Sequence, residues 1–466
     1  PRMRTKLVLA VLAAIAAAAP VHAGVELIAA GSLDAHQGDR AMRTAAPLEN
    51  GVPGNLLGGL GSALAYAGCD RFVALPDRGP NAVPYDSVVD DTSSYIARFH
   101  TLRMELRPAG ADAALPFALT PKLERTTLLW DLFPLYYGDG RAANLPDGAP
   151  RENHAFHHYF SGRSDNADPS RGSGWPLDGR LDPEGIRVSA EGDAVFVSDE
   201  YGPYVYKFDR RGGRRLDSYA LPAHFYVAKT APHGADEIAG NTSGRVANKG
   251  MEGLAISPDG RVLFGAMQAP LIQDGGDGAP VLRIARIDLR TRQVREYAYP
   301  LTNSGTTAKP KYNGVSEILA VNDHQLLVDE RDGKGFGDGS EAKFKRVYLI
   351  DLAGATEVGK LSGAAALAAV AVQKTPFLDV VAELGRHGML PSEIPAKLEG
   401  LSFGPDVTQD GHRRHTLFIA NDNDFLADVT DDLHPQGAAN PNRFFVFAFD
   451  DADLPGLKPQ RIEHCQ

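Results

Sequence analysis

Four glutamates recur along the chain in a common setting that could hold a cation. Each lies near the start of an apolar segment that is followed by a turn and a second apolar segment. The segment pairs are Pro183–Ser189 with Val195–Tyr201, Met251–Ser257 with Val262–Gln268, Val315–Val321 with Leu326–Arg331, and Leu398–Gly404 with Leu417–Asn423. The four glutamates are Glu184, Glu252, Glu317 and Glu399. Two apolar segments joined by a turn are typical of a β-hairpin, so each glutamate is predicted to open the first strand of a hairpin.

Acidic residues also end the second segments. Asp199, Asp329 and Asp422 lie there, and Asp77 with Arg78 takes the matching place in a weaker copy that lacks the glutamate. The start of the first strand and the end of the second lie at the same end of a hairpin. Crowded carboxylates raise one another's pKa unless a cation compensates, and a hard, oxygen-seeking ion suits them. We therefore predict a Ca²⁺ site. Its expected ligands are Glu184, Glu252, Glu317, Glu399, Asp199, Asp329 and Asp422.

A structural interpretation of the glutamates stays open beside this one. A repeated glutamate at a strand start can accept backbone N–H bonds from the neighbouring hairpin, and repeats preserve such contacts as readily as ligands. Arg78 and Arg331 stand beside the carboxylates, where a guanidinium could stabilise developing negative charge. With Asp77 they are the candidate catalytic residues. Lys249 fits an ordinary salt bridge better.

Other polar clusters give weaker signals. His154, His157 and His158 have a spacing that could hold a transition metal, but no Cys or Asp framework accompanies them, so we interpret them as polar loop residues. Gly333–Gly339 lacks the ending and the following helix of a phosphate-binding loop. Gly400–Gly404 matches G-x-S-x-G, but it lies inside the apolar segment Leu398–Gly404 that is predicted to be a strand. A nucleophile elbow needs a turn between a strand and a helix, which weakens the case for a serine esterase.

The repeated hairpins predict an all-β fold, a β-propeller. Their spacing leaves room for four strands in each unit, and the long interval before Glu184 has room for one degenerate unit, which makes six blades; five or seven also fit. Residues 25–30 are expected to pair with late strands such as Arg443–Phe449 and close the ring. Residues 133–180 are predicted to form a long inserted loop or cap, and residues 376–384 a short helix.

Composition and the first residues indicate an exported protein. The 466 residues carry a net charge of −11 without a dense basic run beyond the first residues, which disfavours nonspecific nucleic-acid binding. Residues 1–23 have the basic start, apolar run and small-residue end of a signal peptide. We expect a single domain over 24–466, without a later membrane span, in the periplasm or secreted. Only two cysteines are present, Cys69 and Cys465, and oxidising surroundings would favour a disulfide between them.

The motifs together resemble the phytase-like family known as "esterase-like activity of phytase". The resemblance rests on Leu75–Asn81, Asp182–Ile186, Asn248–Leu254, Tyr312–Ile318 and Lys397–Leu401. It spans nearly the whole chain after the leader. It implies an exported β-propeller that hydrolyses phosphate or carboxylic esters, and it assigns no catalytic residue.

Three functions follow as hypotheses. The first is a metal-dependent hydrolase of phosphate esters, in which a metal-bound water attacks phosphorus. The second is a carboxylester or lactone hydrolase on the same ring of carboxylates. The third is a noncatalytic exported binding protein with a structural cation. In the first two the partner is a small-molecule ester, anionic in the first, and no partner protein can be named.

Overall fold

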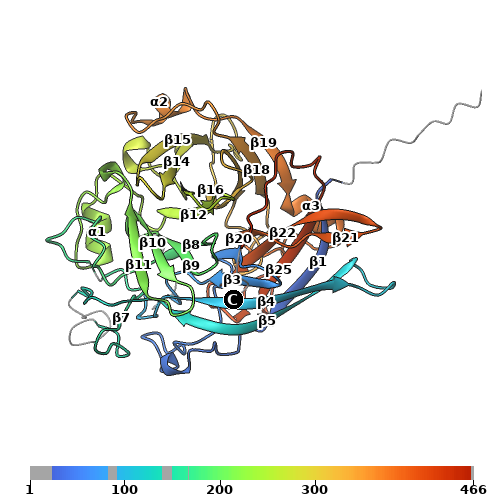
Figure 1. Ribbon diagram of the computed structural model, residues 1–466, viewed down its shortest axis with the longest axis horizontal. Coiled ribbons are helices and arrows are strands. Elements are labelled where there is room, and N and C mark those ends of the chain that lie inside the picture. Colours follow the sequence, from blue (N-terminus) through green and yellow to red (C-terminus); the bar gives the residue numbers. More distant parts are fainter. Residues whose placement is uncertain (1–23, 82–91, 139–148, 166, 463–466) are drawn as a thin grey trace, which may run out of the picture.

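Five antiparallel sheets surround a central axis. A computed structural model describes residues 24–81, 92–138, 149–165 and 167–462. Each sheet has four strands on its main path, and Figure 1 shows the sheets arranged as the blades of a propeller. The first blade contains β2 (Ala63–Tyr66), β3 (Arg71–Leu75), β4 (Arg98–Pro108) and β5 (Phe117–Leu128). The second contains β8 (Pro183–Val188), β9 (Ala194–Asp199), β10 (Tyr204–Asp209) and β11 (Arg215–Ala220).

The remaining blades follow in chain order, and the last one is completed by the first strand. Blade three contains β12 (Met251–Ile256), β13 (Val262–Met267), β14 (Val281–Asp288) and β15 (Val294–Pro300). Blade four contains β16 (Gly314–Ala320), β17 (Gln325–Arg331), β18 (Lys345–Asp351) and β19 (Lys374–Asp379). Blade five contains β20 (Lys397–Phe403), β22 (His412–Asp422), β25 (Asn442–Phe449) and β1 (Glu26–Leu33).

Short elements decorate the blades. The short strands are β6 (Trp130–Asp131), β7 (His158–Tyr159), β21 (Val407–Gln409), β23 (Asp428–Val429) and β24 (Ala438–Ala439). The helices are α1 (Gly234–Gly240), α2 (Ala364–Ala368) and α3 (Val380–Arg386), with 3₁₀ turns at Met42–Thr44, Ala223–Phe225 and Ile272–Asp274. No helix in the described ranges is both long and apolar enough to span a membrane.

The blade count of six was wrong, and the long interval before Glu184 explains the error. The described residues of that interval form no extra blade. Its residues form the long β4–β5 hairpin, with strands of 11 and 12 residues, and the irregular segment that follows. The described part of the 133–180 insert packs against the first two blades, where Leu135, Tyr137 and Phe160 join the core with Val73 and Tyr206.

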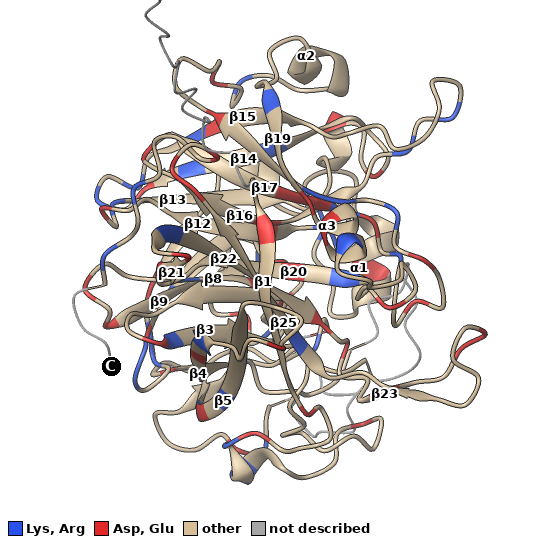
Figure 2. Ribbon diagram, turned by 90° about the vertical axis from the view of Figure 1, so that its right-hand side faces the viewer, with Lys and Arg blue, Asp and Glu red and all other residues tan. Residues whose placement is uncertain are grey.

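The first strand closes the ring, as predicted. β1 pairs antiparallel with β25 from Glu26↔Ala448 to Leu33↔Asn442. Figure 2 shows both strands near the centre of its view, with basic and acidic residues intermingled over the blades and loops around them. Pairing the two ends of the chain in one sheet removes the gap that an open ring would leave. Residues 1–23, the predicted signal peptide, lie outside the described residues.

The predicted helix at 376–384 begins later than expected. Phe377 and Leu378 extend β19, and the helix α3 begins at Val380. The carboxylate of Asp379 accepts a hydrogen bond from the Ala382 N–H at 3.0 Å and caps the helix. A capping aspartate satisfies an amide that has no partner in the first helical turn, so the helix starts after Asp379 rather than before it.

Candidate functional site

The first strand of each blade lies at the axis, which brings three of the four repeated glutamates together. In β8, β12 and β20 the pairing with the next strand is interrupted by a β-bulge, between Pro183 and Ile186, between Met251 and Gly253, and between Leu398 and Gly400. Each bulge includes the repeated glutamate. Bulges re-aim a side chain at the rim of a sheet. The side chains concerned are the buried Glu184, Glu252 and Glu399.

Glu317 does not join the other three, because it lies one residue after the bulge of its strand instead of in it. The bulge of β16 falls at Ser316, between Val315 and Glu317, so Ser316 occupies the place that Glu252 has in β12. Glu317 takes the place of Gly253. Its Oε1 accepts hydrogen bonds from Leu254 N at 2.9 Å and Ile318 N at 3.0 Å. This matches the structural interpretation of the repeated glutamate for this residue.

Arg187 pairs with Glu317 at the centre of the ring. The guanidinium lies 2.9 Å from Glu317 Oε2 and both side chains are almost fully buried. Its remaining N–H groups donate to backbone carbonyls of three other inner strands, those of Leu64 at 2.7 Å, Ile318 at 2.9 Å and Leu401 at 3.3 Å. Together, Arg187 and Glu317 bind the inner strands of all five blades. The axis is therefore filled by side chains at this level.

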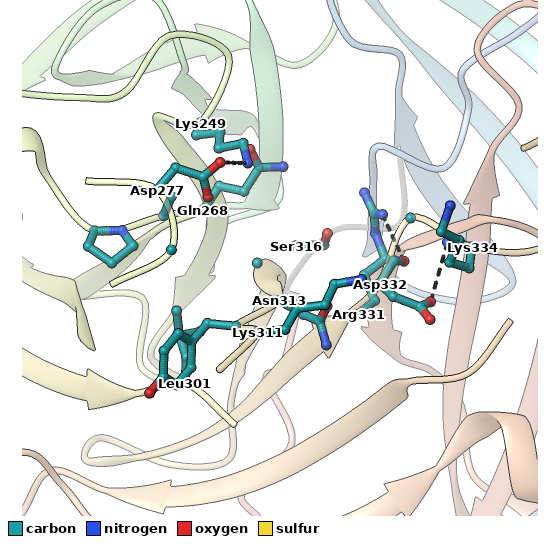
Figure 3. A pocket seen from close by; sticks show the side chains of 16 residues that line it. Lys249, Gln268, Asp277, Leu301, Lys311, Asn313, Ser316, Arg331, Asp332 and Lys334 are labelled. Carbon is teal, nitrogen blue, oxygen red and sulfur yellow. Dashed lines mark hydrogen bonds and ion pairs between the residues drawn. The ribbon is translucent and has the colours of Figure 1, made fainter. Parts of the chain in front are cut away.

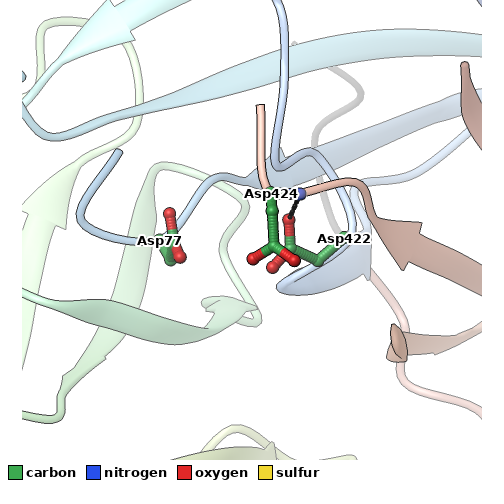
Figure 4. Close-up of side chains that lie close together, drawn as sticks. All are labelled: Asp77, Asp422 and Asp424. Atoms are coloured by element: carbon green, nitrogen blue, oxygen red, sulfur yellow. Dashed lines mark hydrogen bonds between the residues drawn. The ribbon is translucent and has the colours of Figure 1, made fainter. Parts of the chain in front are cut away.

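One group of aspartates joins the first and last blades. Asp77 follows β3, Asp422 ends β22 and Asp424 lies two residues after it. Each offers a carboxylate oxygen within 4.8 Å of the others, and Figure 4 shows Asp422 beside Asp424, with Asp77 facing them. Asp424 has φ +51° and Phe425 +56°, a conformation that costs energy for residues with a Cβ. The Asp424 N–H donates to Asp422 Oδ1 at 2.7 Å, and this turn holds both carboxylates toward the axis.

A second acidic group lies at the second blade and contacts residues next to the first and third blades. Asp182, Glu184 and Glu200 are all buried and offer oxygens within 4.8 Å of one another. Asp182 pairs with Arg78 at 2.9 Å, and Glu200 Oε1 accepts from Gly250 N at 2.8 Å. Among the described residues, Glu184 has neither a hydrogen-bond partner nor an ion-pair partner, although its exposure is only 7%. A buried carboxylate without a partner is costly, so Glu184 is the group that most needs a ligand.

The pKa values show that the two acidic groups share one electrostatic environment. Burial, followed by the charges of Glu252, Asp182 and Glu200, raises the pKa of Glu184 well above its usual range. Burial, followed by Glu200 and Glu399, does the same for Glu252. The carboxyls within this connected set, here called the acidic mouth, are Asp77, Asp182, Glu184, Glu200, Glu252, Glu399, Asp422 and Asp424.

Four cations compensate the acidic mouth in part. Arg78 pairs with Asp182, Arg331 pairs with Glu399, and Lys397 Nζ lies 3.1 Å from Asp422 and also contacts Asp424. Arg245 also acts on Glu200 through its charge, and eight carboxyls against these four cations leave a deficit of positive charge. Carboxylate oxygens with a few carbonyls are the ligands that Ca²⁺ prefers, so the donor set fits a hard divalent cation.

Asp199 and Asp329 lie near the acidic mouth but outside its two groups. Asp199 Oδ1 accepts from Asp182 N and Tyr201 N, both at 3.0 Å, which fixes the turn after β9. Burial raises the pKa of Asp199 to about 7 and that of Asp329 to about 8. Asp329 Oδ2 is buried without a hydrogen-bond partner among the described residues.

A pocket of about 230 Å³ opens beside the acidic mouth. Two of its lining residues also contact the mouth: Gln268 donates to Glu252 at 3.0 Å and Arg331 pairs with Glu399. Figure 3 shows Lys249 and Asp277 on one side of the pocket and Arg331, Asp332 and Lys334 on the other. Lys249 forms an ion pair with Asp277 at 2.7 Å, as predicted for this lysine. Lys311 also lines the pocket, which is therefore basic where the mouth is acidic.

Three carboxyls of the mouth, and one cation beside it, were not predicted as site residues. Asp182, Glu200 and Asp424 lie within two residues of predicted ligands, and Lys397 lies two residues before Glu399, so a wider search around each hairpin end would have found them. The histidines are accounted for differently: the rings of His154 and His157 lie 4.3 Å apart, and His157 stacks on Trp130. Neither belongs to a possible metal group in the described ranges. Cys465, the predicted partner of Cys69, lies outside the described residues, so the disulfide stays a prediction.

Comparison with known proteins decides the family. Residues 55–425 match the phytase-like family described as "Esterase-like activity of phytase". The chain belongs to this family. A relative from Arthroderma benhamiae, named only as an uncharacterized secreted protein, is 31% identical over 299 residues, which cover 56% of this phytase-like chain and 51% of that protein. The chain thus spans about half the length of that relative.

Solved structures with low similarity were also found for this phytase-like chain. A putative 6-phosphogluconolactonase from Bacteroides uniformis is 12% identical, with a TM-score of 0.31, over 82% of this chain and 88% of that one. The WD40 domain of coronin from Toxoplasma gondii is 10% identical, with a TM-score of 0.28, over 95% and 89% of the two chains.

Proposed function

We propose that this phytase-like protein is an exported hydrolase of phosphate esters. Its acidic mouth binds a divalent cation, with Ca²⁺ as the leading candidate. The observation that carries the proposal is Glu184, a buried carboxylate without a partner among the described residues, within a set of eight carboxyls that outnumber the four nearby cations Arg78, Arg245, Arg331 and Lys397. The family description supports ester hydrolysis. The predicted signal peptide and the name of the fungal relative support export.

The residues of the mouth divide into cation ligands and positioning residues. Glu184, Glu200, Glu252, Asp77, Asp422 and Asp424 are the proposed ligands, with Asp182 and Glu399 held beside them by Arg78 and Arg331. A divalent cation bound here would lower the pKa of a water molecule and polarise the phosphoryl oxygen. Arg78 is 5% exposed and also donates to Asn248, so we assign it to orienting Asp182 rather than to contacting substrate.

The basic pocket supports phosphate as the substrate group. Arg331 faces both Glu399 and the pocket, where its planar guanidinium can bind a phosphate oxygen and stabilise the charge that develops there. Lys249, Lys311 and Lys334 supply further positive charge along the walls. An anionic ester can thus be bound by the pocket while its phosphorus lies toward the mouth. A neutral carboxylic ester would gain little from these lysines, although the family's esterase-like description keeps it as the alternative.

The test compares two substrates and two conditions. Purified protein is assayed with p-nitrophenyl phosphate and p-nitrophenyl butyrate, each with Ca²⁺ and after removal of divalent ions, and its melting temperature is followed. We expect Ca²⁺-dependent turnover of the phosphate ester. Turnover of p-nitrophenyl butyrate alone would show that the substrate class is a carboxylic ester instead of a phosphate ester. A melting temperature that depends on Ca²⁺ without turnover of either would favour a binding protein.

A double variant tests the carboxylates of the acidic mouth. Glu252→Gln with Glu399→Gln removes two carboxylates from the mouth while keeping their shapes, and Ca²⁺ affinity and activity are expected to be lost together. Glu191→Gln, in an exposed turn, is the matched control and should keep both. Retained Ca²⁺ affinity in the double variant would contradict the proposed ligand set.

A further inference from the structure

Four arginines line a second open pocket, away from the acidic mouth. Arg40, Arg43, Arg125 and Arg211 surround a space of about 390 Å³, together with Thr126 and Thr127. Among the described residues, no acidic side chain lines this pocket. The whole chain has a net charge of −11, so a concave surface formed by four cations without an acid departs strongly from its average. We call it the arginine pocket.

Three separate segments converge to build the arginine pocket. The segment before the Met42–Thr44 turn is tied to β5, because Arg40 N donates to Thr126 Oγ1 at 3.0 Å. Arg125 lies on β5 itself. The turn after β10 carries Arg211 and is held in place by Trp130, whose Nε1 donates to Gly212 O at 2.7 Å. The arginines are therefore carried on anchored backbone rather than on one free loop.

Among the described residues no carboxylate forms an ion pair with any of the four arginines, although the charges of Asp209 and Glu124 compensate Arg125 in part. Arg125 Nε is buried without a hydrogen-bond acceptor among the described residues, and burial followed by the charge of Arg211 lowers the pKa of Arg125. The adjacent acid Glu124 is engaged elsewhere, with Arg71 and Arg103 at 2.8 Å each. Asp209 accepts from Gly212 N in its own turn.

We propose that the arginine pocket binds an oxyanion of the phosphate or sulfate class, either free or carried on a larger molecule. Guanidinium groups bind such oxyanions through paired N–H donors, and a cluster of them holds more than one anionic group. The volume falls in the range of small-molecule sites. Arg43 lies over the ring of Tyr159 at 5.1 Å, which keeps its charge at the pocket wall. The site is distinct from the proposed catalytic mouth and does not rest on that function.

The test uses inorganic pyrophosphate as a free anion and dextran sulfate as a polymeric one. Both are titrated by calorimetry into protein freed of divalent ions, so that no cation in the acidic mouth attracts them. The variant Arg43→Gln with Arg211→Gln removes two exposed charges of the pocket. The variant Arg261→Gln with Arg290→Gln removes two exposed charges elsewhere and is the matched control. Arg211→Gln alone serves if the double variant loses its fold.

The proposal predicts binding to the unaltered protein and to the control, with affinity at least tenfold lower in the pocket variant. It also predicts that Glu252→Gln with Glu399→Gln leaves this affinity unchanged. If the unaltered protein binds only dextran sulfate and the pocket variant does not, the natural oxyanion is carried on a macromolecule. If the unaltered protein binds pyrophosphate and the pocket variant does not, a free ion suffices. No binding to the unaltered protein, or equal affinity in the pocket variant and the control, would overturn the proposal.

Discussion

Glu184 combines burial, negative charge and the absence of a partner among the described residues. The other carboxylates of the mouth each have some compensation: Asp182 has Arg78, Glu399 has Arg331, and Asp422 has Lys397. Removing the charge of Glu184 therefore breaks no internal contact. Its substitution separates a ligand role from a structural one better than any other position in the mouth.

We expect Glu184→Gln to lower Ca²⁺ affinity at least tenfold and to reduce activity, because the cation loses an anionic ligand. The melting temperature without Ca²⁺ should stay the same or rise, since a repelled carboxylate has been removed. Calorimetric Ca²⁺ titration and thermal unfolding measure the two effects, with Glu191→Gln as control. A variant that melts much lower without Ca²⁺ yet binds it normally would show that Glu184 has a structural role.

Arg187 presents the opposite case, a buried charge with every contact internal. Arg187→Met leaves Glu317 buried without its cation and removes donors from the carbonyls of Leu64, Ile318 and Leu401. Breaking a buried ion pair costs about 3–5 kcal/mol. The double variant with Glu317→Gln should regain part of this stability, because no unpaired charge remains. Urea unfolding checks both, and a loss below about 1 kcal/mol in the single variant would contradict this account.

The sequence predicted which glutamates face the acidic mouth only where the strand register was read correctly. Glu184, Glu252 and Glu399 were found because each sits in the same bulge of its repeat. Glu317 was misaligned by one position, and a shift of one residue in a strand re-aims the side chain. The aligned segments did carry a signal, because the glutamate is the second residue of the other three segments but the third of Val315–Val321. Its pairing with Arg187 was not derivable, since it depends on contacts across the axis.

At the scale of elements, the insert and the first blade meet at a contact that only glycine permits. A Cβ on Gly162 would lie 1.8 Å from the Arg78 carbonyl oxygen, whereas a Cβ on Gly172, in the same insert, would meet nothing within 4 Å. The Gly162 N–H donates to Tyr95 O at 2.8 Å and its carbonyl accepts from the Tyr201 hydroxyl at 2.7 Å, so neither side can move freely.

We expect Gly162→Ala to destabilise the fold by about 1–3 kcal/mol, as overpacking does. The displaced Arg78 should also pull Asp182 away from the mouth and lower Ca²⁺ affinity. Gly172→Ala is the control with the same change in side chain. Thermal unfolding and Ca²⁺ titration measure the two consequences, and equal behaviour of the two variants would contradict the role assigned to this contact.

The sequence predicted inner strands better than outer ones. The inner hairpins repeat a recognisable pattern, because every blade must place similar small and apolar residues at the crowded axis. The outer strands β4 and β5 follow no such repeat, since their outer faces meet solvent or the insert, and their residues were mistaken for a sixth blade. The arginine pocket lies on β5 and its neighbours. Because these segments follow no repeat, no sequence motif predicted the pocket.

For the whole molecule, the buried carboxyls predict a falling stability with rising pH when no cation is bound. The pKa of Asp199 is about 7, and those of Glu200 and Asp329 are about 8, whereas in an unfolded chain such groups titrate near 4. Between these values the folded protein binds more protons than the unfolded chain, so the free energy of unfolding decreases as pH rises. Urea unfolding at pH 5, 6.5 and 8 should show this decrease in cation-free protein.

Ca²⁺ should reduce this dependence, because it favours the ionised carboxylates of the mouth and binds only the folded protein. The same unfolding series with Ca²⁺, and with Na⁺ at matched ionic strength, separates binding from screening. Stability that rises from pH 5 to pH 8 without Ca²⁺, or a slope that Ca²⁺ leaves unchanged, would contradict the arrangement of charges described here.

Closure of the ring by β1 also governs the order in which the chain can fold. β1 pairs with β25, and its register joins Glu26 to Ala448, so almost the whole length of the ring separates two partners in one sheet. During synthesis the first strand emerges long before its neighbour exists. Until β25 arrives, β22 and β1 present unpaired edges, which are prone to intermolecular pairing. Contacts so distant in sequence are slow to form. The ring therefore cannot close before β25 has been synthesised, and a chain cut short before β25 would leave the edges of β1 and β22 unpaired.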